Sequence, residues 1–133
     1  MIIFLDSNPV IYFIEQPPTW GLCATARVAA ARAAGDRLAV SDLVRMECLV
    51  GPLKSGDAAV LAAYAAFFAL PDVHVFPITP AVCDRGARIR ATHGFKPLDS
   101  LHLAAAVEHG CGLFLTADAQ LARFPDVTVE VLT

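Results

Sequence analysis

The feature that most constrains this fold is the alternation of short apolar runs with longer segments that have helical features. The runs are apolar on both faces of a strand, which is typical of parallel sheets that are covered on both sides. We therefore predict an α/β sandwich, in which a central, mainly parallel sheet is flanked by helices. The predicted strands or extended segments are residues 2–5, 38–40, 73–77, 112–115 and 127–131.

The segments between these strands carry helix start and stop signals. Ser41 is a predicted N-cap, and Gly94 and Gly110 follow predicted helices where a terminal glycine is common. Because proline lacks an N–H, we expect the helix that opens at Ser41 to stop at Gly51-Pro52. The predicted helices are residues 9–14, 19–34, 41–50, 58–70, 81–92 and 98–108, with a turn of helix at 119–124.

Length and composition limit the class of protein. A chain of 133 residues fits one domain, residues 1–133, and its 56% hydrophobic and 17% charged residues exclude a disordered chain. The longest apolar stretch, 58–70, is shorter than the roughly 20 residues that span a bilayer, and no basic segment after Met1 begins a signal peptide. We expect a cytoplasmic protein without a membrane segment. Its four cysteines form no Cys-x-x-Cys pair, which favours buried thiols over zinc ligands or disulfides.

The apolar side chains exceed what one small core needs. We expect some of them to face a partner, either a second copy of the chain or another protein, although core packing is the alternative for each one. The side chains concerned are Val10, Ile11, Phe13, Ile14, Trp20, Tyr64, Phe67 and Phe68.

The net charge of −3 excludes nucleic-acid binding by phosphate neutralisation alone, since that attraction comes from an excess of Lys and Arg. A nucleic acid would have to be held by a local basic patch or through metal ions. Arg85, Arg88 and Arg90 share one predicted helix, and Lys96 follows it. Arg85, Arg88 and Lys96 are candidate RNA contacts, and a solvated helix face is the alternative.

Two acidic residues follow predicted strands. Asp6 ends the run Ile-Ile-Phe-Leu, and Asp118 comes shortly after residues 112–115. Because ligands of parallel sheets collect at the carboxyl ends of the strands, both carboxylates are predicted at the same edge. The simpler interpretation is that each caps the helix that follows it.

Two more acids occupy helices. Helical spacing places Glu47 on an apolar stripe, where a charge is costly unless Arg45 or Lys54 pairs with it or the position lies at the rim. Asp99 opens the helix 98–108, where it is either a cap or a partner of His102 three residues later.

Together these four acids indicate a metal site. Carboxylates gathered at one edge cannot all stay ionised without a cation between them, and ligation by oxygen alone favours Mg²⁺ or Mn²⁺ over zinc. Such an ion suits phosphodiester hydrolysis, because it activates water and stabilises charge on the leaving oxygen.

Four segments, in this order and spacing, resemble the PIN domain family, and most of all the VapC toxins of toxin–antitoxin pairs. The segments are Asp6-Ser7-Asn8, Arg45 to Gly51 around Glu47, Leu98 to Ala106 around Asp99, and Thr116 to Leu121 around Asp118.

The resemblance implies a PIN-like α/β/α sandwich and an endoribonuclease that depends on Mg²⁺ or Mn²⁺. Its catalytic, metal-binding residues would be Asp6, Glu47, Asp99 and Asp118, supported by Ser7, Asn8 and Thr116. It also implies a homodimer and a VapB-type antitoxin partner. Where many relatives carry Asn or Arg, this chain has Ala117, so one polar contact near Asp118 is missing.

Two other functions remain open at this point. A phosphotransfer domain with an aspartyl nucleophile also places acids at strand ends, but Asn8 occupies the position where such phosphatases carry a second Asp. A PIN-fold protein outside a toxin–antitoxin pair could process RNA, or bind RNA or protein without cutting.

Overall fold

The computed structural model describes all 133 residues and contains one five-stranded sheet. Every neighbouring pair of strands is parallel, in the order β3-β2-β1-β4-β5, which confirms the predicted α/β class. β1 lies at the centre, and three of its four residues are buried. The strands are β1 (Ile2–Leu5), β2 (Arg37–Ser41), β3 (Val73–Phe76), β4 (Leu113–Thr116) and β5 (Thr128–Val131).

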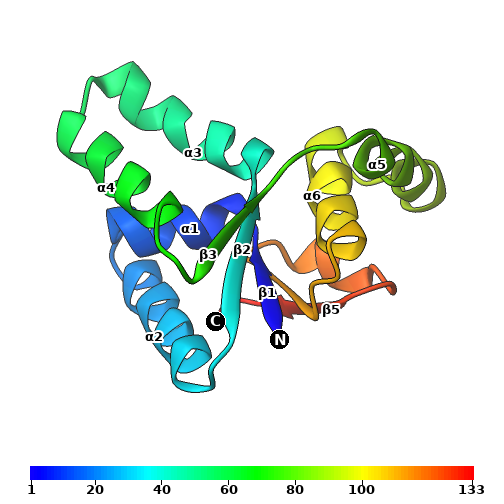
Figure 1. The fold of residues 1–133 in the computed structure, drawn as a ribbon, viewed down its shortest axis with the longest axis horizontal. Coiled ribbons are helices and arrows are strands. Elements are labelled where there is room, and N and C mark those ends of the chain that lie inside the picture. Colours follow the sequence, from blue (N-terminus) through cyan, green and yellow to red (C-terminus); the bar gives the residue numbers. More distant parts are fainter.

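Six helices flank the sheet. Figure 1 shows α1 to α4 on one side of it and the α5–α6 pair on the other. None of these helices has the length and apolarity that a bilayer crossing requires. The helices are α1 (Ser7–Glu15), α2 (Trp20–Ala33), α3 (Asp42–Ser55), α4 (Ala58–Phe68), α5 (Pro80–His93) and α6 (Pro97–Glu108), and a short 3₁₀ helix, η1, spans Ala119–Arg123.

The predicted end of α3 at Gly51-Pro52 is wrong, because the helix continues to Ser55. Pro52 lies in the last part of the helix, so its missing N–H costs a single backbone hydrogen bond, and its side chain is buried. Its carbonyl still accepts from the backbone N–H groups of Gly56 and Asp57. Gly56, in the left-handed conformation, ends the helix instead.

The core accounts for many of the apolar residues that the sequence leaves unassigned. Phe4 and Phe114, on adjacent central strands, stack with ring centroids 5.4 Å apart and are fully buried. Val10, Tyr64 and Phe67 are also buried, so they pack in the core and do not face a partner.

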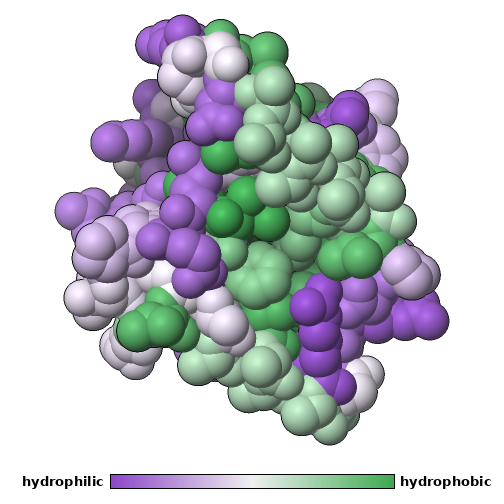
Figure 2. All heavy atoms as spheres, turned by 90° about the vertical axis from the view of Figure 1, so that its left-hand side faces the viewer, coloured by the Kyte–Doolittle hydropathy of each residue, from purple (hydrophilic) through white to green (hydrophobic).

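Other apolar side chains remain at the surface. Figure 2 shows a broad apolar band across the side of the molecule that carries α1 to α4. On α2 and α3, the most exposed large apolar side chains include Trp20, Leu22, Met46, Val50 and Leu53. Met46, Val50 and Leu53 follow helical spacing, so they form one exposed stripe along α3.

Candidate active site

Asp6 links the central strand to the start of α1. Its Oδ1 accepts from the N–H of Ser7 at 2.8 Å, as expected for an N-cap, and its Oδ2 accepts from the hydroxyl of Thr116 at 2.8 Å. Asp6 is only 8% exposed. Asp6 therefore caps α1 and also lies at the carboxyl edge of the sheet.

Thr116 joins two acidic loops. It is the last residue of β4 and is fully buried. Its hydroxyl donates to Asp6 and accepts from the backbone N–H of Asp118 at 3.0 Å. Asp118 in turn accepts from the N–H of Gln120 at 2.9 Å, which makes it the cap of η1. The buried hydroxyl thus fixes the spacing between the loops that carry Asp6 and Asp118.

Glu47 reaches across from α3 and is held by two donors. Its Oε1 accepts from the hydroxyl of Ser7 at 2.6 Å and from Nε2 of His102 at 2.5 Å. The alternative partner Arg45 pairs with Asp42 instead. The hydrogen bond from His102 is the main reason why the pKa of Glu47 is lowered, although burial opposes the shift. Glu47 is therefore an ionised carboxylate held in place beside Asp6.

His102 is the buried residue that positions Glu47. It is 1% exposed, and its Nε2 lies 3.9 Å from Oδ1 of Asp6 as well as next to Glu47. Because a carboxylate can only accept, Nε2 carries the proton in this contact. The opposite nitrogen, Nδ1, is buried without a partner, which favours the tautomer with no proton there. The sequence suggested Asp99 as a partner of His102, but the structure pairs His102 with Glu47.

Replacing His102 by leucine removes the donor to Glu47 and is expected to lower the free energy of unfolding near pH 7 by about 1–3 kcal/mol. Since the folded-state pKa of Glu47 is lowered, its contribution is complete above the ordinary value of 4.5 and is lost as the pH falls through the lowered value. The stability gap between the two proteins should therefore narrow on acidification, as measured by urea denaturation across pH. His102→Gln, whose amide can donate to Glu47, should recover part of the loss in stability, whereas equal losses in both variants would contradict a positioning role.

Asp99 faces an open cleft. A cavity of about 490 Å³ elsewhere is the larger one, but the cleft of about 470 Å³ is lined by Glu47, Asp99, Asp118 and Lys96. Burial is the main cause of the raised pKa of Asp99, and the nearby Asp6 and Asp118 carboxylates raise this pKa further. His102 and Lys96 oppose the shift. The cleft therefore holds more negative charge than its own cations offset.

The acids of this cleft fit a hard cation by their chemistry. Carboxylates offer only oxygen atoms as metal ligands, and none of the four acids forms an ion pair with Lys or Arg. Burial and the Asp6 and Asp118 carboxylates raise the pKa of Asp99 and so disfavour its charged form, a cost that a bound cation would offset. The structure does not hold three of these side chains at ligand distance from one common point. Glu47, Asp99 and Asp118 line the cleft without forming a closed cage, and Asp6 lies beside them near His102.

The remaining candidate residues are placed as follows. Asn8 is exposed in the first turn of α1 and takes no part in the network around Asp6. Arg85 forms an ion pair with Glu108, which ends α6, whereas Asp99 lies in the first turn of that helix. Nine residues of helix separate these positions by about 13 Å, so Arg85 lies away from the cleft. Arg88 is exposed on α5.

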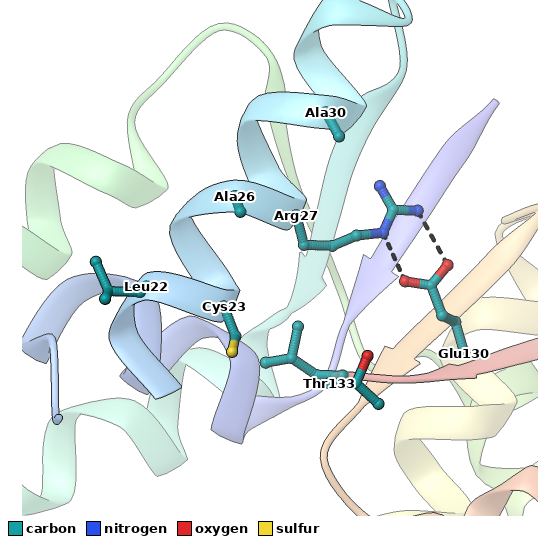
Figure 3. A pocket seen from close by; sticks show the side chains of 8 residues that line it. Leu22, Cys23, Ala26, Arg27, Ala30, Glu130 and Thr133 are labelled. Atoms are coloured by element: carbon teal, nitrogen blue, oxygen red, sulfur yellow. Dashed lines mark hydrogen bonds and ion pairs between the residues drawn. The ribbon is translucent and has the colours of Figure 1, made fainter. Parts of the chain in front are cut away.

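The largest cavity lies beside α2 and contains none of the four acids. Figure 3 shows Arg27 directed at Glu130, with which it forms a two-point ion pair at 2.6 and 3.2 Å. The walls around this pair are mostly apolar, as Leu22, Cys23 and Ala26 illustrate. Since the two charges satisfy each other, the cavity holds no unpaired side-chain carboxylate and no unpaired basic side chain.

The comparisons with known proteins identify the fold family. The family model described as the PIN domain matches residues 3–127. This chain belongs to the PIN domain family. The resemblance of the four acidic segments is thereby confirmed at the level of the family, and Asp6, Glu47, Asp99 and Asp118 all lie within the matched residues. A search of curated proteins finds no match.

Solved structures of toxin–antitoxin proteins share this PIN fold. VapBC2 from Rickettsia felis, bound to a promoter DNA fragment, is 17% identical, with 100% of each chain covered and a TM-score of 0.81. VapBC from Salmonella typhimurium, bound to DNA, is 21% identical over 98% of each chain, with a TM-score of 0.78. VapC20 from Mycobacterium tuberculosis, a toxin that cleaves the sarcin–ricin loop, is 17% identical over 95% of this chain and 98% of its own, with a TM-score of 0.73.

Sequence reasoning missed two features of this PIN domain. It did not connect Ser7 and His102 to Glu47, because the three residues lie on α1, α6 and α3. It also did not single out Arg123, which follows Asp118 by five residues and lines a cavity with it. A basic residue close behind an acidic one was the only available signal for Arg123.

Proposed function

We propose that this PIN domain is a VapC-type toxin, an endoribonuclease that uses Mg²⁺ or Mn²⁺ to hydrolyse RNA phosphodiester bonds. The observation that carries the proposal is the acidic cleft at the carboxyl edge of the sheet. Glu47, Asp99 and Asp118 line this cleft, Asp6 lies near the His102 that binds Glu47, and no Lys or Arg forms an ion pair with any of the four acids. Carboxylates that crowd together without a basic ion-pair partner are rare unless a cation is bound there.

In this proposal the four acids bind the metal ion, and other residues hold the acids in position. Asp6, Glu47, Asp99 and Asp118 would hold the ion, which supplies an activated water and stabilises charge on the leaving oxygen. Ser7 and His102 fix the Glu47 carboxylate by hydrogen bonds to its Oε1. Thr116 fixes the distance between the Asp6 and Asp118 loops. The chain therefore orients its carboxylates before a cation or RNA arrives.

The partner in this proposal is a VapB-type antitoxin, and the toxin itself forms a homodimer in the cytoplasm. The exposed α3 stripe of Met46, Val50 and Leu53, with Leu22 on α2, offers apolar surface for protein contacts. The solved structures of like fold include VapBC complexes, which support a partner of this type.

Cleavage of RNA tests the proposal directly. Purified protein is incubated with transfer, ribosomal and messenger RNA, with Mg²⁺, with Mn²⁺ and with a chelator. We expect cleavage by the native protein only when a divalent ion is present, with 5′-phosphate on the products. Asp6→Ala and Asp99→Ala should be inactive while retaining the native circular dichroism spectrum. Intact RNA in every reaction, or equal cleavage by the variants, would refute the assignment of these acids to a nuclease site.

A further inference from the structure

A second, smaller cavity adjoins the acidic cleft. It measures about 250 Å³ and shares Lys96, Asp99 and Asp118 with the cleft. Its far side is lined by Gln120 and Arg123, which come from η1. The two cavities therefore adjoin each other, and the second one carries two basic side chains where the first carries one.

Arg123 is held firmly in this cavity. Its guanidinium carbon lies 4.1 Å from the centre of the Phe95 ring, and its Nη1 donates to the carbonyl of His93 at 2.9 Å. A guanidinium has five N–H donors, so most of its donors remain free. Because stacking on an aromatic ring and one backbone hydrogen bond already fix its orientation, Arg123 loses little freedom when it binds an anion.

The positive charges of Lys96 and Arg123 are not neutralised by an ion pair within the chain, so they can bind an anion. Arg27, Arg32, Arg45 and Arg85 each form an ion pair with a carboxylate of the chain. Lys96 and Arg123 form none.

Two further features favour an anion here. Lys96 is the N-cap of the 12-residue helix α6, whose N-terminal end attracts negative charge. The side-chain amide of the exposed Gln120 forms no hydrogen bond within the chain, so it is free to bind a ligand. A pocket of this volume is smaller than the roughly 300–1,000 Å³ of drug-sized sites, so it suits one phosphate and sugar.

We propose that Lys96, Gln120 and Arg123 form a subsite for a backbone phosphate of single-stranded RNA, next to the phosphodiester that lies over the acids. The inference rests on the proposed nuclease function, because the shared Asp99 and Asp118 place the subsite one step along the strand from the cleft. The sequence pointed to Lys96 together with Arg85 and Arg88, whereas the cavity joins Lys96 to Arg123. The basic pair offsets the carboxylates that would otherwise repel the RNA.

RNA binding without cleavage tests the subsite. The probe is a fluorescein-labelled, mixed-sequence single-stranded RNA of about 12 nucleotides, within the usual site sizes for such strands. Anisotropy is measured in a chelator, so that no divalent ion supports cleavage. Arg123→Gln and Lys96→Gln should each weaken binding about 3- to 10-fold near 0.1 M salt and reduce the salt slope by about 0.7, the value for one lost phosphate contact. Arg37→Gln, at an exposed arginine that begins β2 and lines neither cavity, removes the same charge and should change neither quantity as much.

One further variant, melting curves and a competing anion complete the experiment. Arg123→Lys keeps the charge and should retain the salt slope, while melting curves check that Arg123→Gln stays folded. Inorganic phosphate at matched ionic strength should leave the RNA bound, and its displacement of RNA would identify a free-anion site instead. No binding by the native protein, or equal losses in Arg37→Gln and Arg123→Gln, would overturn the subsite. RNA binding is measured without a divalent ion, so it does not depend on catalysis. A protein that binds RNA but never cleaves it would therefore overturn the nuclease function and leave the subsite in place.

Discussion

Asp99→Asn is expected to lower metal-dependent RNA cleavage by at least about 10²-fold and, at the same time, to raise the melting temperature of the metal-free protein. The loss should exceed the 10- to 100-fold typical of residues that only orient a metal ligand, because Asp99 faces the cleft directly. The gain in stability follows from the raised pKa of Asp99, whose charged form is disfavoured by burial and by Asp6.

The sign of the stability change depends on pH. Since the folded-state pKa of Asp99 is raised above the ordinary value of 3.8, the native protein loses stability as the pH rises from there through the raised value. The asparagine variant carries no such charge, so the two proteins should differ at pH 7 and converge below about pH 3.8. Melting curves from pH 3 to pH 8 in a chelator measure this difference.

The effect of divalent ions on the melting temperature tests the role of Asp99 in a second way. Mg²⁺ or Mn²⁺ should raise the melting temperature of the native protein much more than that of Asp99→Asn, because a ligand of the folded state stabilises it by mass action. Asp84→Asn removes an exposed carboxylate on α5 and should behave like the native protein in both assays. A lower melting temperature for Asp99→Asn at pH 7, or full cleavage by it, would contradict the role assigned to this acid.

Thr116→Val is expected to reduce cleavage about 10- to 100-fold and the free energy of unfolding by about 1–3 kcal/mol. Valine has nearly the same shape as threonine but no hydroxyl. The substitution removes the donor to Oδ2 of Asp6 and the acceptor for the N–H of Asp118 in a fully buried position. Both loops that carry these acids then lose their common anchor.

Thr116→Ser is the control for this change. Serine keeps the hydroxyl and loses one methyl group, so it should retain most of the activity while losing some packing energy. Urea denaturation gives the free energies, and initial rates of RNA cleavage give the activities. Equal activity of the valine variant and the native protein would show that the hydroxyl does not position Asp6 and Asp118.

Much of the fold follows from local sequence features. The apolar run Ile2–Leu5 is too uniform for a half-exposed strand, so it predicts a buried strand in a covered parallel sheet, and β1 is buried at the centre of that sheet. Caps were equally readable, since Ser41 and Gly94 satisfy the exposed ends of α3 and α5 as predicted. The stop expected at Gly51-Pro52 failed because a proline near a helix end removes one hydrogen bond, which packing can offset.

Part of the candidate site also follows from local sequence features. The sequence by itself determined that Asp6 and Asp118 lie at the carboxyl edge of the sheet, because Asp6 directly follows β1 and Asp118 comes two residues after the end of β4, and strand direction is fixed in a parallel sheet. It also determined that Glu47 needs a compensating partner, since a carboxylate on an apolar helix stripe is costly.

Only the tertiary structure decided what that partner is. Residues 7, 47 and 102 are brought together by the packing of α1, α3 and α6, and local spacing carries no information about such contacts. The same holds for Arg123, which the fold of η1 places beside Lys96 while the pairing with Glu108 draws Arg85 away. Strand direction and helix caps are set by neighbours along the chain, whereas hydrogen-bond partners and charge balance are set by neighbours in space.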